Sequence, residues 1–234
     1  MDTSVVLRSI RTFAARHRST LEAIPKRQSG LLELGAFVGI QEHYRSSGFS
    51  VRIQNPRPGG PLKVKTSTKG HPWNYTRVLV SSATASAELH MNLLVAGAHD
   101  DGAYCVDVAI TSAGAVPSRA SRSPWRELAN RDLLSFAEAK SLRVYPMLLA
   151  QFVGIVHEVK PNFLRGPIAA GFGRQGNLPP TLIALGPFSA NADAIVRAYP
   201  RRNFCIHVAE NYDGRLAAYR ARKCSSPLFW NHEA

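Results

Sequence analysis

The sequence predicts an α/β protein, with a mixed β-sheet flanked by helices and a helical extension before it. Short β-branched, apolar segments alternate with amphipathic helical ones along the chain, which is the pattern of α/β folds. A strand–helix–strand unit in the second half favours parallel strands added to the same sheet. The 234 residues, 45% of them hydrophobic, suffice for one domain with a substantial core. We therefore expect a helical extension over residues 1–28 and one domain over residues 29–234.

Two helices are expected first. Apolar residues at three- and four-residue steps run from Val6 to Ile24 and predict one amphipathic helix, which Pro25 ends. A second helix is expected over residues 30–46, with Ser29 as its N-terminal cap.

Short runs of β-branched and apolar residues predict the strands of the sheet. In chain order they are residues 49–53, 77–81, 87–95, 104–110, 133–140, 181–185 and 204–208. Helices are expected over 145–158 and 189–199. In the strand 87–95, alternation places Leu89, Met91 and Leu93 on one face.

The charge of the chain predicts an anionic partner. The formal net charge is +13 and the sequence pI is about 10.2, and such an imbalance favours nucleic acid as the partner. The three cysteines are scattered without a Cys-x-x-Cys pair, which argues against a disulfide framework and a zinc site. No apolar run reaches membrane-spanning length. We therefore expect a cytoplasmic protein with no membrane partner.

Several enzyme classes lack their signatures. The chain has neither a P-loop nor a Gly-x-Ser-x-Gly nucleophile motif, which argues against an ATP motor and a metal-free hydrolase. Residues 171–176 match Gly-x-Gly-x-x-Gly, but Pro179 and Pro180 follow where a dinucleotide site needs a helix. This segment is therefore expected to be a loop.

Charged residues lie in two of the predicted strands. Asp107 interrupts the apolar strand 104–110, and Glu138 and Lys140 lie two residues apart in the strand 133–140, so their side chains point the same way. A buried carboxylate needs a partner or a metal. If the strands are neighbours, the three side chains converge and form a site for a hard cation beside a positive charge. The alternative is a surface strand with an ordinary ion pair.

Residues 55–70 form a basic segment with three prolines and three glycines, which predicts a loop. Its lysines, beside Trp73 and Tyr75, favour contact with a nucleic-acid backbone and stacking on a base; a solvated loop is the alternative. The expected nucleic-acid-binding residues are Lys63, Lys65, Lys69 and Arg143.

The order of these parts resembles the restriction-endonuclease-like nucleases, the PD-(D/E)XK superfamily. The resemblance covers residues 29–160: a helix with Glu33, a strand pair, Asp107 on a strand, Glu138-Ala139-Lys140 on the next, and a helix with Gln151. One departure is Val106, where the pattern has proline. The resemblance implies an endonuclease that uses Mg²⁺, with Mn²⁺ as a substitute, to hydrolyse DNA in defence or mobile-element processing; RNA is not excluded.

The resemblance also implies a role for each residue. Asp107 and Glu138 would bind Mg²⁺, and Lys140 would orient or activate the attacking water. Glu33 would assist a second ion, and Gln151 would position phosphate. Two rivals for the place of Glu33 lie on the strand expected beside Asp107, namely Glu88 and His90. A homodimer or a separately encoded partner stays open, as does a non-cleaving nucleic-acid-binding module on the same fold.

Overall fold

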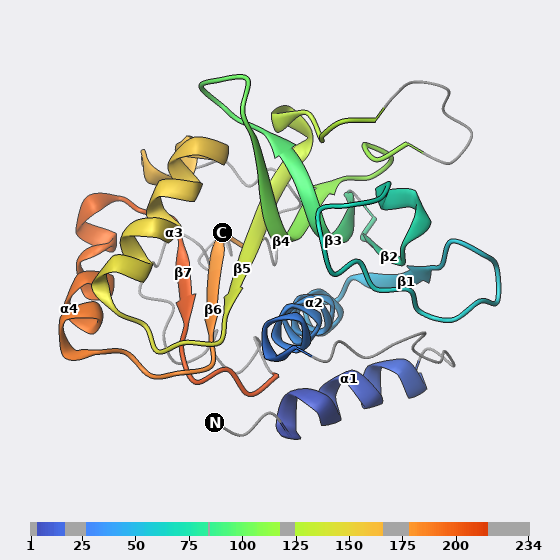
Figure 1. Ribbon diagram of the computed structural model, residues 1–234, viewed down its shortest axis with the longest axis horizontal. Helices are drawn as coiled ribbons and strands as arrows, with labels where there is room; N and C mark the ends of the chain where they lie inside the picture. The colour runs from blue at the N-terminus through green and yellow to red at the C-terminus, as the bar shows by residue number, and fades with distance from the viewer. Residues whose placement is uncertain (1–3, 17–26, 84, 118–124, 166–177, 215–234) are drawn as a thin grey trace.

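The strands of the computed structural model form one mixed sheet (Figure 1). The structure describes residues 4–16, 27–83, 85–117, 125–165 and 178–214. Within these ranges the strands are β1 Ser50–Gln54, β2 Arg77–Ser81, β3 Ser86–Ala96, β4 Ala103–Ser112, β5 Leu133–Lys140, β6 Thr181–Ala184 and β7 His207–Ala209. Strand neighbours in the sheet follow chain order, antiparallel from β1 to β5 and parallel from β5 to β7.

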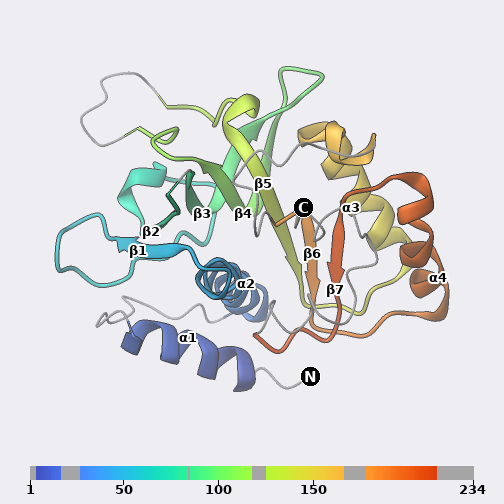
Figure 2. The same cartoon turned by 180° about the vertical axis from the view of Figure 1, so that it is seen from behind.

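Helices cover both faces of this sheet (Figures 1 and 2). The α-helices are α1 Ser4–Arg16, α2 Gln28–Ser46, α3 Pro146–Val159 and α4 Ala190–Ala198. Helix α2 lies against one face with α1 outside it, while α3 and α4 cover the other face. Because α3 and α4 each carry the chain back across the sheet, β5, β6 and β7 run parallel. The predicted mixed sheet flanked by helices is confirmed.

Each face of the sheet has its own hydrophobic core. Under α2, side chains such as Leu32 and Phe37 pack on inward residues of the sheet such as Val80. Under α3, the buried rings of Phe136 and Phe152 meet edge to face, with centroids 6.2 Å apart. Buried Ile10 of α1 belongs to the same core as α2. The boundary between residues 28 and 29 stays a prediction, and α1 packs on the helix that follows it.

Most predicted elements are present, with shifts at their ends. Strands β2 and β5 match their predicted ranges, whereas β7 begins three residues later than expected. Helix α2 begins at Gln28 with Arg27 in the capping position, so Ser29 is not its cap. Helix α1 ends at Arg16, and residues 17–26 and the glycine-rich 171–176 lie outside the described residues. No helix in the described ranges is long and apolar enough to cross a membrane.

A left-handed residue in the middle of β3 breaks the expected alternation. Asn92 has φ 48°, a conformation that asparagine tolerates better than most residues. Before it, Leu89 and Met91 belong to the core under α2; after it, Leu93 belongs to the core under α3. The prediction that these three apolar side chains share one face is therefore wrong for Leu93. The left-handed conformation of Asn92 switches the face of the sheet to which the following side chains point.

Helix α2 is buried along most of its length, and its glycines admit a close neighbour. The Tyr212 hydroxyl donates a hydrogen bond to the Gly35 carbonyl oxygen at 2.8 Å. A methyl group at Gly39 would overlap that hydroxyl, and one at Gly35 would overlap Val6 of α1. The lack of side chains at these positions therefore sets how closely α1 and the segment after β7 approach α2.

We expect Gly39→Ala to destabilise the protein by about 1–3 kcal/mol, because the added methyl group overpacks a buried contact. Combining it with Tyr212→Phe, which removes the overlapping hydroxyl, should cost less than the sum of the two single changes. Urea unfolding measures all three variants. Gly154→Ala is the matched control: it adds a methyl group to open space on α3 and should stabilise by about 0.5–1 kcal/mol. If the destabilisation of the double variant equalled the sum for the two single variants, the proposed overlap of the Gly39 methyl group with the Tyr212 hydroxyl would be contradicted.

Candidate active site

The candidate site lies where β4 and β5 separate. Their antiparallel pairing runs only as far as Val108 opposite Ala137. Beyond this pair, β5 pairs with β6, while β4 continues beside β3. The Asp107 carboxylate enters the gap and accepts a hydrogen bond from the Ala139 backbone N–H at 2.8 Å. The Asp107 side chain thus replaces a backbone hydrogen bond that β4 and β5 do not form at this point.

Asp107, Glu138 and Lys140 meet in this gap. The Lys140 Nζ lies 3.1 Å from Asp107 Oδ2 and 2.7 Å from Glu138 Oε2. The two carboxylate oxygens therefore lie within about 6 Å of each other, the sum of these distances, on either side of the Lys140 ammonium. The sequence predicted this convergence, and the geometry agrees with it.

Glu138 lacks enough partners for its charge. Its side chain is buried, and Oε1 has no hydrogen-bond partner among the described residues. Burial, followed by the nearby Asp107 carboxylate, raises the pKa of Glu138 to about 7, while Lys140 acts in the opposite direction. The ammonium of Lys140 thus compensates the two carboxylates only in part.

Lys140 itself is held in its charged form. Burial alone lowers the pKa of its ammonium group, but Glu138 and Asp107 outweigh burial and raise it above the usual value. Beside these two carboxylates, both within hydrogen-bond reach, Lys140 is a poor proton acceptor.

Glu33 of α2 reaches the same region. Asn92 Nδ2 donates to Glu33 Oε2 at 3.0 Å and to the Lys65 carbonyl oxygen at 2.9 Å. Burial raises the pKa of Glu33, the Asn92 hydrogen bond lowers it, and the Asp107 charge raises it again. Glu33 therefore lies within electrostatic range of Asp107. Sequence reasoning missed Asn92 as a residue of the site; the available signal was an amide inside a buried strand.

Cys105 belongs to the same surroundings. Its Sγ lies 4.0 Å from Asn92 Oδ1. Burial, then the Asp107 carboxylate, raises the pKa of the Cys105 thiol to about 11. The thiol is therefore protonated at neutral pH and a poor nucleophile, so it adds no chemistry of its own to the charged cluster.

The two rivals of Glu33 lie elsewhere. Glu88 Oε2 contacts His90 Nε2 at 3.1 Å and Arg77 at 3.4 Å, and Glu88 Oε1 accepts from the Gly114 N–H at 3.3 Å. These contacts form a separate buried ion-pair group. Of the three candidates, Glu33 is the residue whose pKa responds to the Asp107 charge, whereas Glu88 and His90 contact each other and Arg77.

The remaining predicted site residues do not join the cluster directly. Gln151 is exposed on α3 and forms no hydrogen bond with the cluster in the described part of the chain. Lys65 is buried, and its Nζ donates to the Asn92 carbonyl oxygen at 2.6 Å, so it does not offer its charge to a phosphate as predicted. Lys69 and Arg143 are exposed, and Lys63 lies over the Tyr75 ring.

The donor set suits a hydrated Mg²⁺ better than a full protein cage. No group of three or more histidine, cysteine or acidic side chains is placed to hold a metal within the described ranges. Mg²⁺, however, keeps several waters and is commonly bound by only one or two carboxylates. Asp107 and the unpartnered Oε1 of Glu138 supply hard oxygen donors of that kind.

We expect Lys140→Met to destabilise the protein by about 1–3 kcal/mol, since it leaves two neighbouring carboxylates without their shared cation. Thermal and urea unfolding in EDTA measure the cost. Lys160→Met is the matched control: Lys160 is also half-buried, but among the described residues its ammonium donates to a neutral group, the Asn130 carbonyl oxygen at 3.1 Å. Adding Glu138→Gln to Lys140→Met should recover part of the loss. If Lys140→Met destabilised the protein equally with Glu138 and with Gln at position 138, the stabilising pair of Lys140 and Glu138 would be contradicted.

Comparison with known proteins returned no match. No family model, no curated protein and no solved structure matches this chain. The likeness to the restriction-endonuclease-like nucleases therefore stays a prediction.

Proposed function

We propose that the protein is a Mg²⁺-dependent DNA endonuclease with a restriction-endonuclease-like fold. One observation carries the proposal: Asp107 and Glu138, from two strands that separate at this point, share the Lys140 ammonium. Phosphodiester hydrolysis needs charge neutralisation and an aligned water, and two carboxylates beside a cation supply the residues for both. The net charge of +13 supports a polyanionic substrate.

Each residue has a role that follows from its contacts. Asp107 and Glu138 would hold the metal, which when bound supplies Lewis-acid neutralisation of phosphate charge and a more acidic water. The carboxylate neighbours of Lys140 raise its pKa, so we assign it the role of a positive charge for phosphate or water rather than that of a base. Glu33, held by Asn92, is the nearby carboxylate that would assist a second ion.

The wild-type protein should nick supercoiled plasmid DNA in Mg²⁺ or Mn²⁺ and not in EDTA. Asp107→Asn and Lys140→Met should each lower the rate by roughly 100-fold or more, because each removes a charge that the transition state needs. Asp193→Asn is the control: it breaks an exposed pair with Arg197 on α4 and should leave nicking unchanged. Full activity of both site variants would refute the assignment.

Metal binding is expected to be measurable without cleavage. Mg²⁺ or Mn²⁺ should raise the melting temperature of the wild-type protein in a concentration-dependent way, because a ligand that binds the folded state stabilises it. Asp107→Asn combined with Glu138→Gln should abolish this rise, while Asp193→Asn should keep it. An equal rise in all three proteins would place the metal elsewhere.

A second candidate is a nucleic-acid-binding module that does not cleave. The observation that favours it is the Lys140 ammonium, which already pairs with both carboxylates. In this case DNA binding falls steeply with salt, and neither nicking nor a metal-dependent melting shift occurs. A cytoplasmic location, and a homodimer or separate partner, stay predictions under either candidate.

A further inference from the structure

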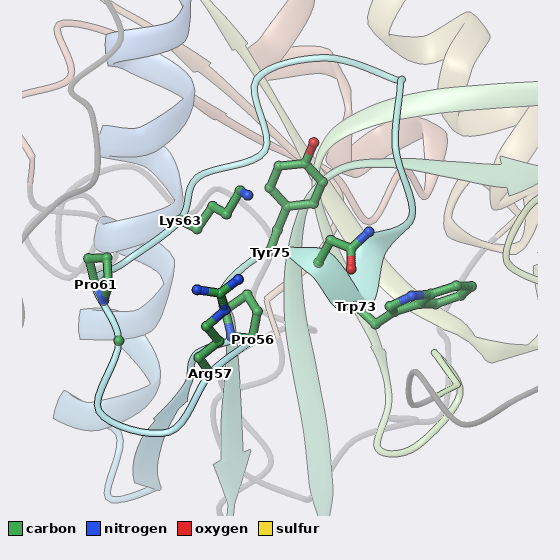
Figure 3. A pocket seen from close by; sticks show the side chains of 8 residues that line it. Pro56, Arg57, Pro61, Lys63, Trp73 and Tyr75 are labelled. Atoms are coloured by element: carbon green, nitrogen blue, oxygen red, sulfur yellow. The ribbon is translucent and has the colours of Figure 1, made fainter.

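A second surface feature lies on the segment between β1 and β2. It is a groove of about 590 Å³ whose lining includes Arg57, Lys63, Trp73 and Tyr75 (Figure 3), a volume in the range of ligand sites. The picture shows Tyr75 in the middle, with Lys63 and Arg57 to one side and Trp73 to the other. A neighbouring hollow of about 520 Å³ shares three of these residues and adds Arg52. The name nucleotide groove is used below for this surface.

The groove is built by an ordered segment. Asn55 Nδ2 donates to the Gly60 carbonyl oxygen at 2.6 Å, and its Oδ1 accepts from Thr76 Oγ1 at 2.8 Å. The backbones of Lys63 and Thr76 are joined at 2.8 Å, with Leu62 buried beneath them. These bonds fix both rims of the groove before any ligand arrives, which lowers the ordering cost of binding.

The Trp73 ring is held by two other rings, and the Tyr75 ring lies beneath the ammonium groups of Lys63 and Lys65, 5.8 and 5.9 Å from its centroid. The Trp73 indole stacks on the His71 ring, with centroids 4.4 Å apart and planes within 4°. Trp125 meets the same indole edge to face at 6.3 Å. Trp73 and Tyr75 are only half-buried. Rings that are supported and yet partly exposed are suited to stacking with a flat ligand.

The charge around the rings is of one sign. No acidic residue lines the groove or the neighbouring hollow. Within the described residues Arg52, Arg57 and Lys63 form no ion pair with a carboxylate; by contrast, Arg77 is held by Gln54 and Glu88. Three cations without carboxylate partners beside two rings match a phosphate joined to a base.

From this combination we propose that the nucleotide groove binds an unpaired nucleotide of a single-stranded nucleic acid, with the base against Tyr75 or Trp73 and the backbone phosphate at Arg57 and Lys63. Bases in a duplex have their faces covered by neighbouring pairs, so only an unpaired base can present its face to a protein ring. The groove thus recognises a single strand, a flap or a loop.

The same segment is joined to the charged cluster. Lys65, two residues beyond Lys63, donates to the Asn92 carbonyl oxygen, and the Asn92 amide bonds both Lys65 and Glu33. Hydrogen bonds therefore connect the segment that carries the groove to Glu33, which lies within electrostatic range of Asp107. Binding in the groove needs no metal and no cleavage, so it stands or falls separately from the nuclease proposal.

The test is fluorescence anisotropy of labelled oligothymidylate, measured in EDTA over a range of salt. The wild-type protein should bind it more tightly than the same strand paired with its complement. Tyr75→Leu should weaken single-strand binding by roughly tenfold, whereas Tyr75→Phe, which keeps the ring, should not. Arg57→Gln should weaken binding and lower the salt slope by about one.

Arg201→Gln, an exposed arginine after α4, is the matched control and should keep both affinity and slope. Asp107→Asn should also keep binding, which separates this proposal from cleavage. Equal affinity for single and double strands, or an unchanged affinity of Tyr75→Leu with circular dichroism unchanged, would overturn the proposal. Competition by polyphosphate as strong as that of unlabelled oligothymidylate at the same phosphate concentration would overturn it as well, because polyphosphate has no base to stack.

Discussion

The constraint on which this site depends is the cost of removing two carboxylates from water where a sheet divides, with Glu138 buried and Asp107 half-buried. Strands β4 and β5 stop pairing after Val108 and Ala137, and the gap leaves the Ala139 N–H without a strand partner on that side. Asp107 satisfies this donor, and Glu138 is buried next to it. Unpaired charges at this depth would be costly, so Lys140 has to stay close and protonated. Ion pairing with Lys140 thus holds both carboxylates in this gap.

The left-handed residue Asn92, where the side chains of β3 change faces, connects the surroundings of the gap between β4 and β5 to helix α2 and to the segment after β1. The left-handed Asn92 in β3 moves the following apolar residues, such as Leu93, to the core under α3. It also frees the Asn92 amide to bond Glu33 on α2 and Lys65 on the segment after β1. Without that change of face, the period of two would place the Asn92 side chain on the same face of the sheet as His90. The hydrogen bonds that join β3 to α2 and to the segment after β1 would then be lost.

The protein thus presents two chemically different surfaces. The charged cluster combines acids with one ammonium and suits a hard cation and a phosphodiester. The nucleotide groove combines rings with cations that lack carboxylate partners and suits a base with its phosphate. Lys65 belongs to neither surface. It was expected to contact nucleic acid, but it is buried and holds the segment after β1 to Asn92. The lysines of one short segment therefore differ in role because they differ in burial.

Some features of the protein follow from local sequence. Alternation and β-branching determined β2 and β5, helical spacing determined α2 and α3, and the period of two placed Glu138 and Lys140 on one side of β5. These rules depend on near neighbours, so a single chain reveals them. Only the tertiary structure decided that Glu33, rather than Glu88, lies within electrostatic range of Asp107, that Gln151 is exposed on α3, and that Lys65 is buried. Those outcomes depend on where β4 and β5 separate and on the change of face at Asn92. Both features arise from contacts between residues far apart in the chain.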